Sequence, residues 1–265
     1  MMKSVDVRLS CWFRPFDSAL VAFSGGLDSS VVARAAQRAL GANALAVTAC
    51  SPSSSTQERE ESAKIAQEIG IRHILVESDE FDDPLYLRND RDRCYYCKKN
   101  RFASLVRFAN EQNFQVVLDG TNADDQFDFR PGQRAVDELG VRSPLAELGI
   151  KKEDARKLAK KWKLSVWNKP AAPCLSTRVP YDQPLTASLL RRIEAAEVFL
   201  RTFGFSPLRV RVQGETTARI EVPVDQLAKL LEPSVRESLI EKFQSLEFRT
   251  ISVDLQGFRS GSLNG

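Results

Sequence analysis

Short apolar runs alternate with longer amphipathic stretches along the first part of the chain. The apolar runs cover residues 19–23, 44–49, 72–77 and 115–120. The amphipathic stretches, which have helical periodicity, cover about 29–40, 58–70 and 95–113, with Gly41 and Gly70 where two helices should end. Continuously apolar strands are typical of a parallel sheet that is covered on both faces. The pattern therefore predicts an α/β fold with a doubly wound parallel sheet.

The pattern changes after a proline-rich stretch at residues 170–184, which we expect to be a loop. The remainder predicts a helix that begins at Thr186, two strands, a second helix and a last strand. These elements cover residues 186–204, 208–214, 217–222, 225–244 and 248–258. This order indicates a small α+β domain. We therefore predict a first domain at 1–169 and a second domain at 170–265, which would serve the substrate or oligomerisation.

Composition narrows the class of protein. The 265 residues are 43% hydrophobic, which is enough for a core, and no apolar run has the length that a membrane span needs. The net charge of +3 disfavours a nucleic-acid partner. The N-terminus lacks the apolar region of a secretory signal, so we expect a cytoplasmic protein with free thiols. The single histidine, His73, lies in an apolar run and is expected to be structural.

The segment FSGGLDSS, residues 23–30, follows an apolar run and begins a helical one. This is the setting of a loop that binds phosphate with glycine backbone, hydroxyls and a helix N-terminus. It differs from a Walker A loop, which has a lysine before the serine. Asp28 would hold Mg²⁺ rather than phosphate. The predicted nucleotide-binding residues of the loop are Ser24, Gly25, Gly26, Leu27, Asp28, Ser29 and Ser30.

Polar residues follow two other apolar runs, where an open α/β sheet binds its ligands. Thr48 and Ser51 would line the adenine and ribose. Gly120, Thr121 and Asn122 would approach nucleotide or substrate, and Asp124 would assist the metal. The alternative for this second group is a set of polar residues at the start of a helix.

Cys94 and Cys97 in RCYYCKK form a pair whose chemistry the spacing alone leaves open. Such a pair serves as a redox couple, half a zinc site or part of an iron–sulfur cluster. Cys174 stands in a proline-rich segment beside Arg178, a polar setting that favours thiolate. Three thiolates are enough to hold a [4Fe–4S] cluster with one open iron. The two remaining cysteines, Cys11 and Cys50, are expected to be ordinary thiols.

Arg209 and Arg211 alternate with valines in LRVRVQG, so on a strand both guanidinium groups share one face. Such a pair suits a substrate phosphate or carboxylate. The alternative is a solvated strand face. Glu197 in the preceding helical stretch would bind a metal or pair with these arginines.

Four motifs spread over nearly the whole chain together resemble the LarE family of ATP-dependent sulfur transferases, within the PP-loop ATP pyrophosphatases. They read SGGLDSS, GTNADD followed by RPG, PCLSTRVPY and GFRSGSLN. The resemblance implies a Rossmann-like PP-loop domain that uses ATP and Mg²⁺. It implies that a carboxylate of pyridinium-3,5-biscarboxylate mononucleotide is adenylated and converted to a thiocarboxylate. The product would lead to the nickel-pincer nucleotide cofactor of lactate racemase.

The resemblance also implies catalytic roles for Asp28, Cys174 and Arg178. In one branch of the family the PCLSxR cysteine gives up its own sulfur and becomes dehydroalanine. The additional Cys94 and Cys97 are similar to a second branch, in which three cysteines hold a [4Fe–4S] cluster. We therefore expect Cys94, Cys97 and Cys174 to bind the cluster, with sulfide or a sulfur donor protein as a partner.

Two other functions fit parts of the sequence. A tRNA thiolase would combine a similar loop with a cluster, although the modest charge argues against it. The other is a nucleotide-binding module without catalytic activity, held together by a metal ion, in which Asp28 and the three cysteines would be dispensable for any turnover. The family resemblance further implies a homo-oligomer, with a hexamer as the implied size.

Overall fold

The computed structural model describes residues 4–127, 131–170 and 173–259. The chain divides into two compact units, one of residues 1–86 and 92–172, the other of residues 87–91 and 173–265. Each unit is described by itself. The predicted domain boundary between residues 169 and 170 stays a prediction.

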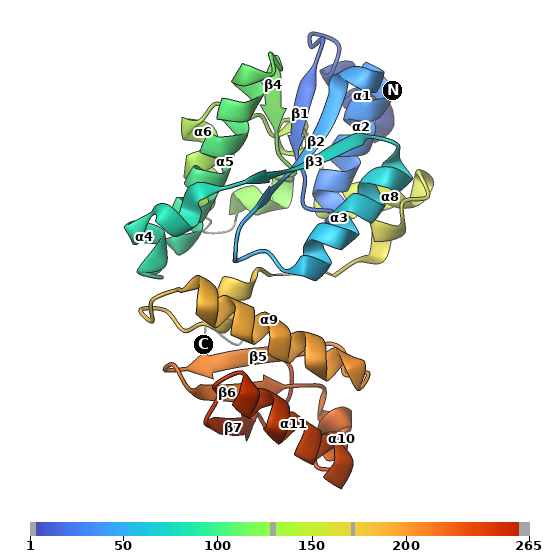
Figure 1. The fold of residues 1–265 in the computed structure, drawn as a ribbon. Helices are drawn as coiled ribbons and strands as arrows, with labels where there is room; N and C mark the ends of the chain where they lie inside the picture. Colours follow the sequence, from blue (N-terminus) through green and yellow to red (C-terminus); the bar gives the residue numbers. More distant parts are fainter. Residues whose placement is uncertain (1–3, 128–130, 171–172, 260–265) are drawn as a thin grey trace. The chain divides into compact units, whose positions relative to one another are not determined.

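The first unit is built on a four-stranded parallel sheet with the order β3-β2-β1-β4. The strands are β1 (Ala19–Ala22), β2 (Ala44–Cys50), β3 (Arg72–Glu77) and β4 (Val116–Leu118). The helices are α1 (Val5–Trp12), α2 (Leu27–Leu40), α3 (Thr56–Ile69), α4 (Pro84–Leu87), α5 (Arg93–Glu111), α6 (Pro131–Glu138), α7 (Pro144–Glu147) and α8 (Lys152–Lys161). Helices α2 and α8 lie on one side of the sheet and α5 and α6 on the other (Figure 1). The predicted doubly wound α/β fold is confirmed.

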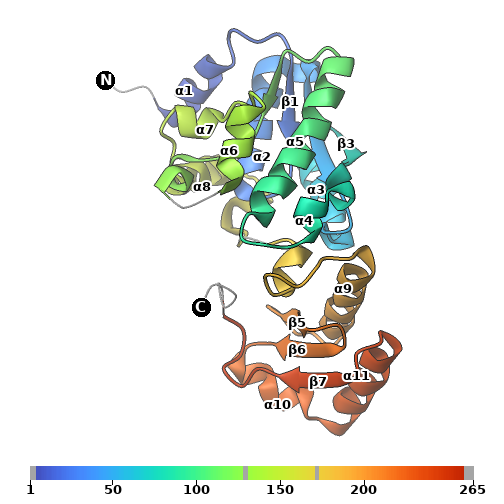
Figure 2. The same ribbon diagram turned by 90° about the vertical axis from the view of Figure 1, so that its left-hand side faces the viewer.

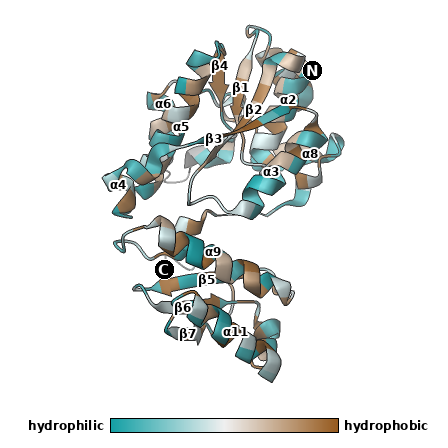
Figure 3. Ribbon diagram, viewed as in Figure 1, coloured by the Kyte–Doolittle hydropathy of each residue, from teal (hydrophilic) through white to brown (hydrophobic). Residues whose placement is uncertain are grey.

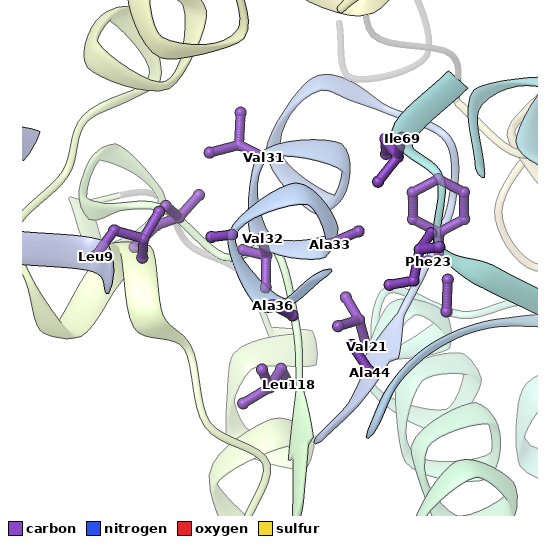
Figure 4. Packing of buried hydrophobic residues seen from close by; sticks show 14 of the residues in the cluster. Leu9, Val21, Phe23, Val31, Val32, Ala33, Ala36, Ala44, Ile69 and Leu118 are labelled. Carbon is purple, nitrogen blue, oxygen red and sulfur yellow. The ribbon is translucent and has the colours of Figure 1, made fainter. Parts of the chain in front are cut away.

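Successive residues of β1 explain the two layers. Val21 packs into the core that α1, α2 and α8 cover, whereas Leu20 packs into the core that α5 and α6 cover. Both residues are fully buried. In the first core, Val32 and Ala36 of α2 face the sheet around Leu118 (Figure 4). The hydrophobic colour accordingly gathers on the central strands (Figure 3).

The structure corrects several expectations for this unit. Helix α2 begins at Leu27, two residues before the predicted start, so Asp28 lies in its first turn. Strand β3 is an edge strand in which no residue is fully buried, not the buried strand that its apolar run predicted. Helices α1 and α8 were not predicted. Gly70 ends α3 with a left-handed backbone, as its position indicated.

The second unit contains a three-stranded sheet with the order β5-β6-β7 (Figure 2). Strands β5 (Arg209–Gln213) and β6 (Thr217–Glu221) are antiparallel, and β7 (Thr250–Val253) is parallel to β6. As predicted, helix α9 (Ala187–Thr202) begins after Thr186, and the Thr186 side chain accepts a hydrogen bond from the Leu189 amide. The predicted helix at 225–244 is wrong as a single element. It forms α10 (Leu227–Leu230) and α11 (Pro233–Ser245), because Pro233 cannot continue the first helix and starts the second.

Candidate active site

The predicted phosphate loop connects β1 to the N-terminus of α2. Gly25 has φ +64°, and a Cβ there would lie 2.9 Å from Ser62 Cα of α3, so only glycine fits. The Ser24 and Ser29 hydroxyls lie 3.1 Å apart and bond the loop to itself. The loop therefore has a fixed shape, with the first amides of α2 at its open end.

Two lysines that the sequence analysis missed lie beside this loop. Lys152, the first residue of α8, places Nζ 3.9 Å from Asp28 Oδ2. Lys169 Nζ donates to Gly25 O at 3.1 Å and pairs with Glu61 at 2.7 Å. Burial opposes ionisation of Glu61, but its bonds to Lys169 and Gln57 outweigh burial and lower the pKa of this carboxyl. Both lysines are far from the loop in sequence, so no local motif marks them.

Gly120 at the end of β4 packs against the start of α2. A Cβ at Gly120 would lie 2.7 Å from Ser29 N, so this glycine permits the close approach of the two segments. The buried Asp119 carboxylate accepts from Thr121 and, at 2.6 Å, from Ser143. The Thr121 hydroxyl therefore shapes this loop.

Two polar atoms at this edge of the sheet are buried without a hydrogen-bond partner among the described residues, namely Ser30 Oγ and Asn122 Nδ2. Buried polar atoms left in this way are uncommon and fit a position beside a ligand. The Asp28 carboxylate supplies oxygen ligands of the kind that Mg²⁺ prefers. Asp124 Oδ2 accepts the Lys152 amide at 2.9 Å, so Asp124 holds the start of α8.

The polar residues after β2 are held by side-chain bonds. Thr48 Oγ1 donates to Phe23 O at 2.7 Å and therefore accepts from His73 Nε2 at 2.8 Å. His73 is half-buried, and burial lowers its pKa. His73 therefore holds the Thr48 side chain in place, and its purely structural role stays a prediction. The Ser51 hydroxyl bonds Glu80 at 2.5 Å.

The cysteines have different environments. Cys94 is exposed, while Cys97 is partly buried, and both lie in the first turns of α5. Cys174 is partly buried and precedes a short turn that contains Arg178, in the second unit. No group of three or more His, Cys, Asp or Glu side chains in the described ranges is gathered as a metal site. Burial raises the pKa of the Cys50 thiol.

In the second unit, buried arginines and glutamates form a charge cluster. Arg178 bonds both carboxylate oxygens of Glu197, at 2.9 and 3.2 Å. Arg211 pairs with Glu221 at 2.6 Å and also bonds Thr177 O. The alternative of a solvated strand face is wrong, because Arg209 and Arg211 are 8% and 4% exposed. Glu197 pairs with Arg178 and also accepts the Val210 amide at 3.1 Å.

Arg209 differs from its neighbours in this cluster. Its guanidinium makes no hydrogen bond or ion pair with any residue that the structure describes, and it lies 4.8 Å above the Phe258 ring. Burial, followed by the charges of Arg178 and Arg211, lowers its pKa. Glu197 pairs with Arg178 and Arg201, and Glu221 pairs with Arg211 and Arg219, so that with Arg209 five arginines lie around two buried glutamates. The cluster therefore has a surplus of positive charge suited to an anion.

Parts of two motifs lie outside the described residues: Arg130 of the RPG segment, and the end of GFRSGSLN after Arg259. In the described ranges, no helix has the length and apolar character to cross a membrane.

Comparison with known proteins agrees with these features. Residues 17–195 match the family described as asparagine synthase. Over 264 residues the chain is 42% identical to an uncharacterized protein of Synechocystis, which covers 100% of this chain and 98% of that protein. Over 245 residues it is 38% identical to the pyridinium-3,5-bisthiocarboxylic acid mononucleotide synthase of Lactiplantibacillus plantarum, covering 92% and 88%. An uncharacterized protein of Methanocaldococcus jannaschii is 36% identical over 174 residues, covering 66% and 67%.

Proposed function

Because the chain belongs to the LarE family of PP-loop sulfur transferases, which are ATP-dependent adenylating enzymes, we propose that its substrate is pyridinium-3,5-biscarboxylate mononucleotide. The enzyme adenylates a carboxylate of this compound, releases pyrophosphate and inserts sulfur. The thiocarboxylate product is the precursor of the nickel-pincer nucleotide cofactor of lactate racemase. We propose a cytoplasmic location and a homo-oligomer, as the family resemblance implies.

The observation that carries the proposal is the form of the loop between β1 and α2. Its glycine backbone, its hydroxyls and the first amides of α2 together suit the phosphates of ATP. Asp28 in the first turn would hold Mg²⁺, whose charge stabilises the phosphate oxygens. Lys152 and Lys169 add positive charge at the same loop.

The chemistry proceeds in two displacements. A carboxylate oxygen of the substrate attacks the α-phosphorus, the bond to the β-phosphate oxygen breaks, and pyrophosphate leaves. A sulfur nucleophile then attacks the acyl carbon, and AMP leaves with the original carboxylate oxygen. The protein's part is to align the reacting groups and to stabilise the charge that develops on the phosphates.

The charge cluster of the second unit is proposed to bind the phosphate of the mononucleotide. Glu197 and Glu221 hold Arg178 and Arg211 in fixed positions, and Arg209 offers its guanidinium to the ligand. A phosphate monoester carries about two negative charges at neutral pH, and the positive surplus of the cluster would attract it. Glu197 is proposed to position Arg178 and the strand at Val210.

For the sulfur, we propose a [4Fe–4S] cluster held by Cys94, Cys97 and Cys174. Positions 94 and 97 lie on one face of α5, and thiolates are the usual ligands of such clusters. When bound, the cluster would supply sulfide to the activated carboxylate. A sacrificial Cys174 is the alternative, and mass spectrometry distinguishes the two, as described in the Discussion.

The test measures pyrophosphate release from MgATP in the presence and absence of the mononucleotide. We expect release that depends on the mononucleotide and falls by about 10²-fold or more in Asp28→Ala, because the metal anchor is lost. Asp17→Ala serves as the control, because Asp17 is exposed and precedes β1, at the opposite end of this strand from the phosphate loop. Release unaffected by the mononucleotide, or copurified tRNA as the only activator, would contradict the proposed substrate.

A further inference from the structure

A buried ion pair holds the segment that follows β2. Glu80, in the turn that follows β3, is 0% exposed, yet its carboxylate is a charged group. It accepts hydrogen bonds from Ser51, Ser53 and Ser78, and it pairs with Arg101 of α5 at 2.8 Å. A buried carboxylate is tolerated only when it is paired and fully bonded, so this arrangement depends on all of its partners.

Arg101 extends the same network to the serine loop, which we define as residues 51–54. Its Nη2 lies 3.2 Å from Ser51 Oγ and 2.9 Å from both Ser53 Oγ and Ser54 Oγ. The planar guanidinium thus binds the carboxylate of Glu80 and three hydroxyls at fixed angles. The shape of the serine loop is consequently set by Glu80 and Arg101, and the Ser51 and Ser53 hydroxyls donate to Glu80.

The position of this network gives it a functional consequence. Ser51 and Glu80 follow neighbouring parallel strands, β2 and β3, at their carboxyl ends, where an open α/β sheet binds its ligand. Because the Ser51 and Ser53 hydroxyls donate to Glu80, these two residues would meet the nucleotide through the loop backbone. A backbone contact requires that the loop keeps one conformation.

The network also reaches the helix with the paired cysteines. Positions 94, 97 and 101 of α5 are spaced by three and four residues and lie on one face of the helix. Arg101 therefore fixes the cysteine-bearing face of α5 relative to the serine loop. We propose that Glu80 and Arg101 are positioning residues, which hold the serine loop and the cysteine-bearing helix α5 in the relative position that the reaction requires.

The effect on nucleotide binding is tested with Glu80→Gln and Arg101→Met in the full chain, with MgATP as the probe in calorimetric titration. We expect the dissociation constant of ATP to rise by at least about tenfold in each variant, and by no more in the double variant, because the two groups act as a unit. Arg107→Met is the matched control. Arg107 lies on the same helix and pairs at 2.9 Å with Asp79, but both side chains are more than half exposed. The ATP affinity of Arg107→Met should stay within about twofold of wild type.

A purely structural role would lower the unfolding temperature and leave the ATP affinity of the folded protein unchanged. Titration is therefore made well below the unfolding temperature of each variant. Where Arg101→Met fails to fold, Arg101→Lys keeps the charge beside Glu80 but loses the fork that binds the serines. Wild-type ATP affinity in the folded Glu80 and Arg101 variants would overturn the proposal.

A second experiment, on sulfur transfer, rests on the proposed function. Because the cysteine helix is also displaced, the ratio of thiocarboxylate formed to pyrophosphate released should fall in both variants and not in Arg107→Met. An unchanged ratio would overturn the link to α5. A wild-type protein that binds ATP but releases no pyrophosphate with the mononucleotide would contradict the proposed function, while the affinity comparison would still decide for or against the role of Glu80 and Arg101.

Discussion

Lys152 Nζ lies 3.9 Å from Asp28 Oδ2, across the gap between the first turns of α8 and α2. The Lys152 amide is fixed by Asp124 at 2.9 Å, whereas its side chain is half-exposed and keeps room to move. A cation beside the carboxylate that we assign to Mg²⁺ is placed to bind a phosphate oxygen of the same nucleotide. In this arrangement Asp28 would hold the metal and Lys152 would bind the phosphate.

Replacing Lys152 tests whether this lysine binds the phosphate of ATP. Lys152→Met should raise KM for MgATP by about 10- to 100-fold, the range that a charge-assisted hydrogen bond of about 1.5–3 kcal/mol gives. Lys157→Met is the control, because Lys157 lies one turn further along α8 in an exposed pair with Glu153. Steady-state pyrophosphate release at varied MgATP measures the effect. Equal KM values in the two variants would remove Lys152 from the site.

Of the two arginines of β5, Arg209 gives the more specific test, because its side chain has no partner among the described residues that the substitution would leave unpaired. Arg209→Met should raise KM for the mononucleotide by about 10- to 100-fold and leave KM for ATP nearly unchanged. Arg211→Met would instead remove one of the two arginines that pair with the buried Glu221, leaving only Arg219, and should therefore lower stability as well.

Two comparisons make the Arg209 test specific. Arg236→Met, an exposed arginine of α11, should behave as wild type. The substrate without its phosphate should have the same KM with Arg209→Met as with wild type. An Arg209 effect that persists with this dephosphorylated substrate would mean that the residue does not bind the phosphate.

The cysteines are tested by replacing each with alanine in anaerobically purified protein. If Cys94, Cys97 and Cys174 share one cluster, each variant should lose iron, visible absorption and sulfur transfer together. Cys11→Ala, in α1, should keep all three. With sulfide supplied, wild type should turn over repeatedly, and Cys174 should keep its mass. A dehydroalanine at position 174 together with active Cys94 and Cys97 variants would instead establish the sacrificial mechanism.

His73 predicts a dependence of stability on pH. Burial lowers its pKa in the folded protein, so the unfolded chain binds a proton more readily just below the ordinary value of about 6.5. The free energy of unfolding should therefore fall as pH decreases through about 6.5 and stop falling below the folded-state pKa. His73→Gln, which keeps a donor for Thr48, should remove this part of the dependence. Denaturant unfolding at several pH values measures it, and an identical slope in the variant would contradict the assignment.

The sequence predicted those features that depend on neighbouring residues. The strands of the parallel sheet follow from their apolar runs, and the loop at 23–30 follows from its glycines and serines between a strand and a helix. The end of α3 follows from Gly70, and the start of α9 follows from Thr186. These signals lie within a few residues of the structure that they determine.

The remaining features depend on contacts that only the folded chain brings together. The fully buried Glu80 sits in an acidic segment that looks solvent-exposed in the sequence, and its partner Arg101 is 21 residues away. Arg209 and Arg211 look alike in sequence, yet Glu221 pairs with one of them and a ring covers the other. The exposure of β3 could not be predicted without the order of the strands, because an apolar run does not distinguish an edge strand from a central one.

The central claim is that ATP activates a substrate carboxylate by adenylation, and isotope transfer tests it most directly. Mononucleotide labelled with oxygen-18 in its carboxylates is incubated with the enzyme, MgATP and sulfide, and the AMP is analysed by mass spectrometry. Because the attacking carboxylate oxygen stays on the α-phosphorus when sulfur displaces AMP, we predict AMP that carries one labelled oxygen for each thiocarboxylate formed. AMP without the label, alongside thiocarboxylate product, would contradict the account.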